Sequence, residues 1–303
     1  MLLRLIAVSL LFAAQNPPKP PAPNPPNPPA PSGTPEKGAP GDKAASTTQA
    51  PEMKLEKQTR VGADGVTLTA DYHALPFGDS DRPLVVSFHM EGGSRGEFTK
   101  IAPLFGIWAC SSFAVDLRNG KASGDVPNET AASAASVLKK TEFTNEEAYA
   151  DVVEGLKWAR EIHPDGKIIA LGSGTSASLV LVAVARDAAL ADMVFAFSPS
   201  EDVPGWSVAM ESRKLTVPTF VTCDGSPQEV AKARMIGNSI DKKLRQVVLP
   251  IDVKGAKRGA AILLQETPEL HDRHWMTIVR MLLQIAPAAA PAAQPGGAEP
   301  KKS

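Results

Sequence analysis

Apolar and polar residues follow two different periods along the middle of the chain. Short runs rich in β-branched and aromatic residues predict strands, and longer segments with apolar residues at helical spacing predict helices. The predicted strands cover residues 55–61, 66–75, 84–90, 112–117, 167–171, 193–197, 217–223 and 246–251. The predicted helices cover residues 146–162 and 176–188, with an earlier one carrying Phe98, Ile101, Phe105 and Trp108 and a last one carrying Trp275, Ile278 and Leu282. This alternation predicts an α/β fold, with a mostly parallel central sheet and helices on both faces.

Two of these segments are apolar on nearly every side. The run Leu-Val-Val-Ser-Phe at residues 84–88 is typical of a strand that helices cover on both faces. The run Leu-Val-Leu-Val-Ala-Val at residues 179–184 predicts a helix packed tightly against the sheet. With 43% hydrophobic residues, the chain can bury one substantial core, so we expect a single folded domain.

The two ends of the chain differ in composition from this alternating region. Residues 1–14 place one arginine before an apolar run that is too short to span a bilayer, which predicts a secretory signal or, if uncleaved, a short anchor. Residues 15–52 are rich in proline and predict a disordered spacer, and residues 287–303 predict a disordered tail. The folded domain is therefore expected at residues 53–286. We expect an exported protein, periplasmic or extracellular, with no transmembrane span and a tether at its N-terminus if the signal is retained.

Charge and cysteine content narrow the function classes. The formal net charge is -1 and no basic stripe carries interleaved aromatics, so we expect no nucleic-acid partner. Cys110 and Cys223 fall at opposite ends of different predicted strands, which favours two buried thiols over a disulfide. His271 and His274 have ligand spacing but lack an obvious third donor, and we expect them in a solvated helix start. We therefore expect no metal and no cofactor.

Candidate chemistry lies just past the strands, because ligands of such sheets bind at the carboxyl ends of the strands. The segment after the predicted strand 167–171 reads Gly172-Ser173-Gly174-Thr175-Ser176. It has the small-x-nucleophile-x-small pattern of a strained turn between a strand and a helix. The central residue is Gly174, so this turn lacks the nucleophile that its pattern calls for.

Three segments, HMEGGSRGEF, DLRNGKAS and GSGTSAS, occur in an order that resembles the α/β-hydrolase fold. The resemblance is strongest to dienelactone-hydrolase-like and esterase-like members and spans roughly residues 55–286. In that family the nucleophile centres the turn, an acid follows the seventh strand and a histidine follows the eighth. The resemblance therefore implies Gly174 at the nucleophile position, Asp224 at the acid position and Arg258 in the place of the histidine. Two of the three catalytic positions are replaced, which implies a degenerate triad.

Two functions remain open on this basis. The first is a catalytically inactive pseudo-hydrolase whose pocket binds a small carboxylate or phosphate, or a protein partner in the envelope. The second is an active ester or lactone hydrolase, because Gly174-Thr175-Ser176-Ala177-Ser178 also reads small-x-Ser-x-small and would make Ser176 the nucleophile. A third alternative, a purely structural envelope protein, would show neither ligand binding nor hydrolysis.

The anion pocket of the first function would combine backbone amides, a helix N-terminus and arginine side chains. Besides Arg258, its predicted residues are Gly92, Gly93, Ser94, Thr175 and Arg118. The competing interpretation is a dead pocket filled by an ion pair, either Arg118 with Glu91 or Arg258 with Asp224. His89, in the glycine-rich loop, is expected to shape that loop by hydrogen bonding.

Overall fold

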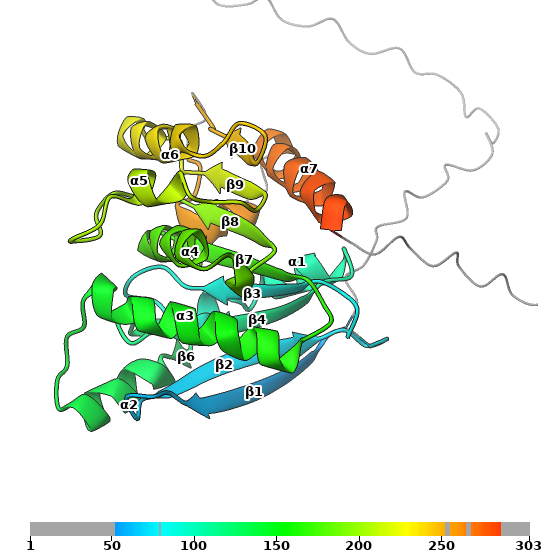
Figure 1. The fold of residues 1–303 in the computed structure, drawn as a ribbon. Coiled ribbons are helices and arrows are strands. Elements are labelled where there is room, and N and C mark those ends of the chain that lie inside the picture. The colour runs from blue at the N-terminus through cyan, green and yellow to red at the C-terminus, as the bar shows by residue number, and fades with distance from the viewer. Residues whose placement is uncertain (1–51, 79, 252–254, 265–267, 286–303) are drawn as a thin grey trace, which may run out of the picture. The chain divides into compact units, whose positions relative to one another are not determined.

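The computed structural model describes residues 52–78, 80–251, 255–264 and 268–285 (Figure 1). The predicted signal or anchor at 1–14, the predicted tail at 287–303 and the predicted spacer at 15–52, apart from Glu52, lie outside the described residues. Within the described ranges, no helix has both the length and the apolar character needed to cross a bilayer.

The described strands form one eight-stranded sheet in the order β1, β2, β4, β3, β7, β8, β9, β10. Their bounds are Lys54–Val61 for β1, Thr67–Ala74 for β2, Leu84–Phe88 for β3, Ser111–Val115 for β4, Ile168–Ser173 for β7, Met193–Phe197 for β8, Thr219–Thr222 for β9 and Arg245–Val248 for β10. The pairs β1–β2 and β2–β4 are antiparallel, and the other neighbours are parallel. The predicted mostly parallel sheet is confirmed, and each predicted strand corresponds to one strand of it.

Helices and short turns of 3-10 helix (η) connect these strands. Their bounds are Arg95–Phe98 for η1, Ala102–Gly106 for α1, Glu129–Leu138 for α2, Asn145–Ile162 for α3, Thr175–Arg186 for α4, Ala188–Leu190 for η2, Val208–Ser212 for α5, Pro227–Ser239 for α6, Gly259–Leu264 for η3 and Pro268–Ile285 for α7. Two short strands, β5 (Ala122–Ser123) and β6 (Val126–Pro127), pair separately from the main sheet.

The single helix expected over residues 98–108 is instead two short pieces, η1 and α1. Pro103 lies in the first turn of α1, where its fixed φ suits a new helix start and its missing amide interrupts a continuous helix. Helices α2 and α6 were not predicted from the sequence. Helix α2 buries only Thr130 and Ala134, so it has no large apolar stripe for a pattern analysis to detect.

Helices cover both faces of the sheet and create two apolar cores (Figure 1). The core under α3, α4, α5 and α6 includes Phe88, Val182 and Cys223. The core under α1, η3 and α7 includes Phe195 and Cys110. Both cysteines are free and buried, as expected. Burial raises the pKa of the Cys110 thiol to about 12 and that of the Cys223 thiol to about 11, so both stay protonated at neutral pH.

Helix α4 lies at the centre of the first core. It packs on β7 and β8 and is flanked by α3 and α5. All ten residues from Thr175 to Val184 are buried, which explains why the helix is apolar on every side. The turn that precedes α4 is therefore held between a buried strand and a buried helix.

Candidate functional site

Gly174 forms the apex of the sharp turn between β7 and α4. Its φ of 61° and ψ of -132° belong to a region that side chains rarely adopt, and its amide donates to the carbonyl of Phe197 at 2.8 Å. A Cβ on Gly172 would collide with the backbone of Ala177, so the turn also requires glycine there. This is the strained strand-to-helix turn that the sequence pattern predicts.

The carboxylate of Glu91 fills the space beside this apex. A Cβ placed on Gly174 would lie only 2.6 Å from Glu91 Oε2. The amide of Thr175 donates to that same oxygen at 2.9 Å, and Arg258 Nη1 donates to Glu91 Oε1 at 2.8 Å. In hydrolases with such a turn, the amide after the nucleophile stabilises the oxyanion of the reaction. Here the corresponding amide already binds a carboxylate from the chain itself.

The surroundings of Glu91 favour its ionised form. Burial raises the pKa of Glu91. The Thr175 amide, the Arg258 guanidinium and the amide of Glu91 itself lower it by more than burial raises it, so the pKa lies below its ordinary value. The side chains of Glu91 and Arg258 are still 37% and 36% exposed. The carboxylate is therefore held as an anion, at a place where water and solutes have access.

A second carboxylate, that of Glu97, lies close to the same turn. It accepts from the Met90 amide at 2.7 Å through Oε2 and from the Ser173 hydroxyl at 2.6 Å through Oε1. Burial raises the pKa of Glu97; the two donors oppose this rise, and the negative charge of Glu91 adds to it. Sequence reasoning considered Glu91 only as a partner of Arg118 and gave Glu97 no role. Their position in the glycine-rich loop could have indicated a place beside the turn, where carboxylates would repel a free anion until one of them is displaced.

The amides of the glycine-rich loop were predicted to face the turn, but those of Gly93 and Ser94 do not. The Gly93 amide donates to the carbonyl of Met90 at 3.0 Å, and the Ser94 amide donates to Ser123 Oγ at 2.8 Å. Gly92 is exposed, with a φ of 76°. The loop uses the amides of Gly93 and Ser94 to close on itself, because a tight turn must satisfy its own backbone groups.

His89 shapes the loop, as expected. Its Nε2 accepts from the Leu117 amide at 2.8 Å, which leaves Nδ1 to donate to the Met90 carbonyl at 2.8 Å. The ring is fully buried, and burial lowers its pKa, so it remains neutral.

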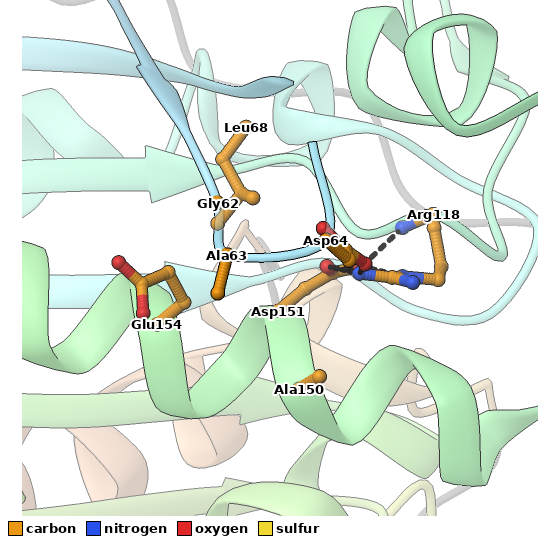
Figure 2. Close-up of a pocket in the computed structure, with 8 residues that line it drawn as sticks. All are labelled: Gly62, Ala63, Asp64, Leu68, Arg118, Ala150, Asp151 and Glu154. Atoms are coloured by element: carbon orange, nitrogen blue, oxygen red, sulfur yellow. Dashed lines mark hydrogen bonds and ion pairs between the residues drawn. The ribbon is translucent and has the colours of Figure 1, made fainter. Parts of the chain in front are cut away.

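Arg118 lies in a separate pocket between the β1–β2 turn and α3 (Figure 2). Its Nη2 donates to Asp151 Oδ1 at 2.6 Å and contacts Asp64 Oδ2 at 2.8 Å. Asp151 is wholly buried and Arg118 is 7% exposed. The prediction that Arg118 belongs to the anion pocket is therefore wrong, and so is the alternative pair with Glu91. Asp151, on helix α3, accepts from both the amide and the side chain of Arg118, and this carboxylate binds the arginine.

Arg258 lies beside the turn, but its partner differs from the one expected. Besides Glu91, it contacts Glu229 through Nε at 3.6 Å. Asp224 accepts from the Ser226 amide at 2.8 Å, just before α6. The negative charge of Asp224 contributes to the raised pKa of Arg258 without a direct ion pair. The structure thus brings Gly174, Thr175 and Arg258 together and leaves Asp224 at the edge of the group.

Ser176, the alternative nucleophile, and His274 both occupy structural positions. Ser176 lies in the first turn of α4, is 2% exposed and donates to the carbonyl of His89 at 2.5 Å. The prediction that His274 is solvated is wrong, because it is fully buried and its Nε2 lies 2.8 Å from Thr222 Oγ1. His271 is exposed beside Asp272. Among the described residues, no group of three or more His, Cys, Asp or Glu side chains could hold a metal ion.

Comparison with protein-family models and with curated proteins gives no match to the sequence. Solved structures do match. Dienelactone hydrolase from Anabaena variabilis superposes with a TM-score of 0.59 at 13% identity, covering 78% of this chain and 100% of that one. Brefeldin A esterase, a bacterial homologue of human hormone-sensitive lipase, superposes with a TM-score of 0.55 at 12% identity, with 81% of each chain covered. A dienelactone-hydrolase-like promiscuous phosphotriesterase from metagenomic libraries superposes with a TM-score of 0.53 at 14% identity, covering 77% of this chain and 99% of that one. The chain therefore has the α/β-hydrolase fold, with dienelactone hydrolases and esterases among its structural neighbours.

Proposed function

We propose that this chain is a pseudo-hydrolase that binds small carboxylates or phosphate at the β7–α4 turn, in competition with its own Glu91. One observation carries the proposal. The Thr175 amide and Arg258 already bind a carboxylate, that of Glu91, beside the apex of the turn.

The residues at the turn argue against hydrolysis there. Gly174 offers no nucleophile, and losing the nucleophile of a catalytic triad lowers the rate on the order of a million-fold. Arg258 cannot replace a histidine base, because a guanidinium stays protonated at any relevant pH. Ser176 could attack only with a general base within hydrogen-bond reach, and its hydroxyl instead donates to a backbone carbonyl.

The same residues favour anion binding. Helix α4 directs its N-terminal amides and the positive end of its dipole at the site, and Arg258 adds a permanent charge. Glu91 acts as a tethered carboxylate ligand. Its ion pair is more than one-third exposed, and an exposed pair contributes little free energy, so the side chain can turn outward and leave its place to a free anion.

Thermal unfolding with acetate, benzoate or phosphate tests the binding. A ligand at a hundredfold excess over its dissociation constant stabilises the folded state by about 2.7 kcal/mol. We expect at least one anion to raise the melting temperature, more strongly in Glu91→Gln, where the internal competitor is uncharged, and not in Arg258→Ala. Glu161→Gln, which removes a surface carboxylate paired with Arg60, is the matched control and should behave as wild type. If no anion stabilises Glu91→Gln, or if Arg258→Ala responds as well, the anion site is refuted.

Hydrolysis of short p-nitrophenyl esters and labelling by a fluorophosphonate test the catalytic alternative. We expect the domain to be no faster than a heat-denatured control and to remain unlabelled. The alternative is an active ester or lactone hydrolase that uses Ser176. It is supported by the structural neighbours that are hydrolases. Turnover or labelling that Ser176→Ala abolishes would establish that alternative.

We also propose that residues 1–14 direct export and that the domain works in the periplasm or outside the cell, as a soluble or tethered protein. The apolar run after Arg4 supports this proposal. An envelope protein remains the proposed alternative partner of the pocket. Fractionation of cells that express the full chain and a variant without residues 1–14 tests the location, and equal amounts outside the cytoplasm in both would refute export.

A further inference from the structure

Arg258 faces a second carboxylate that the proposed function does not use. Glu229, in the first turn of α6, approaches Arg258 Nε at 3.6 Å and is only 12% exposed. Its other oxygen, Oε2, is buried and accepts no hydrogen bond of good geometry within the described part of the chain. Burial raises the pKa of Glu229, and the nearby Ser198 hydroxyl opposes this rise only in part. A buried carboxylate oxygen without a well-placed donor is unfavourable, so this position favours a ligand that brings a donor.

The charges around Arg258 favour a positive donor. Glu91 and Glu229 contact the single guanidinium directly, and the charges of Asp224 and Glu97 also interact with it. The nearby Lys232 offsets this excess only in part, since it pairs with Asp202 at 2.7 Å. When a ligand carboxylate replaces Glu91, Glu229 and Asp224 stay behind. A plain carboxylate then leaves the site with surplus negative charge, whereas a ligand with its own cation neutralises part of it.

This inference rests on the proposed function. We propose that the site prefers free amino acids over plain carboxylates and over phosphate. The ligand carboxylate takes the place of Glu91 on the Thr175 amide and on Arg258, and the neighbouring ammonium group donates to Glu229. Glu91 and Glu229 contact the same guanidinium, so their positions suit the two ends of a small zwitterion. An ammonium group is compact and carries three hydrogen-bond donors. It therefore suits Glu229 Oε2, a buried acceptor without a good donor.

The test is a titration of the full-length protein, followed by NMR, with L-alanine and propionate and with glycine and acetate. The members of each pair differ mainly in the ammonium group. We expect L-alanine to bind at least about tenfold more tightly than propionate, the scale of one charge-assisted hydrogen bond. In Glu229→Gln, which keeps the size of the side chain and removes its charge, we expect the preference to vanish and propionate binding to persist. Glu161→Gln should keep the preference.

The possible outcomes separate this inference from the function on which it rests. If propionate and L-alanine bind equally well to wild type, or if the preference survives in Glu229→Gln, the amino-acid preference is wrong and the anion site stands. If neither compound binds, even in Glu91→Gln, both proposals fail. Amino acids at high concentration stabilise many folded proteins without a site, so only chemical-shift changes that saturate, and that Arg258→Ala removes, count as binding.

Discussion

Two arginines near the carboxyl ends of the strands bind carboxylates under opposite conditions. Arg95 is 5% exposed and contacts Asp116, which is wholly buried, at 2.7 Å and Asp71 at 2.9 Å. Arg258 is 36% exposed and contacts Glu91, itself 37% exposed, at 2.8 Å. The chemical groups are the same and the distances are similar. What differs is the access of water.

That difference separates a structural contact from a candidate binding site. Opening the Arg95 cluster would leave a buried charge without a partner, and this is strongly unfavourable. Opening the Arg258 pair returns both groups to water at little expense in free energy. Under the proposed function, only the second pair exchanges its internal carboxylate for a ligand. An arginine–carboxylate distance alone does not identify a site.

The largest expected effect comes from the buried cluster. Asp116 accepts from the amides of Arg95 and Glu129 as well as from the Arg95 side chain. We expect Asp116→Ala to lower the free energy of unfolding by about 3–5 kcal/mol, the range for breaking a buried ion pair. Urea unfolding measures it. Glu129→Gln, at a 35% exposed partner of Arg95, is the control and should lose less than about 1 kcal/mol. A loss that small for Asp116→Ala would contradict the comparison.

The next effect concerns the turn itself. Gly174→Ala forces a side chain into a positive φ and into contact with Glu91 and Met90. We expect a loss of about 1–3 kcal/mol from the backbone alone, and more from the displaced Glu91. Gly92→Ala is the matched control, because its φ is also positive but the space around it is open. Equal losses in chemical denaturation would show that Glu91 does not fill the space beside Gly174.

A smaller effect is expected at the exposed pair. Arg258→Ala removes the partner of Glu91, which is 37% exposed, and a longer 3.6 Å contact with Glu229, so we expect it to lower the free energy of unfolding by only about 1 kcal/mol. The same denaturation experiment measures this change beside that of Asp116→Ala. A loss as large as that of the buried cluster would make Arg258 a structural residue and would argue against a displaceable ligand.

The smallest effect is in the pH dependence. The pKa of Glu91 is lower in the folded state, so its contribution to stability is present above the ordinary value of 4.5 and is lost as the pH falls through the lowered value. Glu91→Gln should therefore lose less stability than wild type on acidification. The pKa of Glu97 is raised, so its contribution has the opposite sign: it is present below 4.5 and is lost as the pH rises through the raised value. Melting temperatures of wild type, Glu91→Gln and Glu97→Gln across this pH range test both signs, and the same trend in both variants would contradict the assignment.

Local sequence patterns were enough to predict the sheet and the turn. The strands are short, dense runs of apolar residues, and the spacing of Gly172, Gly174 and Ser176 reports a strained turn whose geometry depends on a few consecutive residues. The same reasoning could not find which carboxylates meet which arginines. Arg118 binds Asp151, which is 33 residues away, and that pairing depends on how α3 docks on the sheet.

His274 shows a signal that was present but not used. Leu270, His274, Ile278 and Met281 follow helical spacing, and all four are buried in α7. The histidine therefore lies on the apolar stripe that faces the sheet, where Thr222 contacts its ring. The charged residues between these positions suggested a solvated helix start, because composition alone does not show which face of a helix is buried.

The two cysteines make each core of this molecule separately measurable. Cys110 lies in the core under α7 and Cys223 in the core under α4, and both thiols are buried and protonated. Alkylation requires an exposed thiolate, so each thiol reacts only when its own side of the sheet opens. The ratio of the two alkylation rates therefore reports which layer of helices detaches first. Repeating the measurement with ligand present would show whether the Arg258 site stabilises one layer or both.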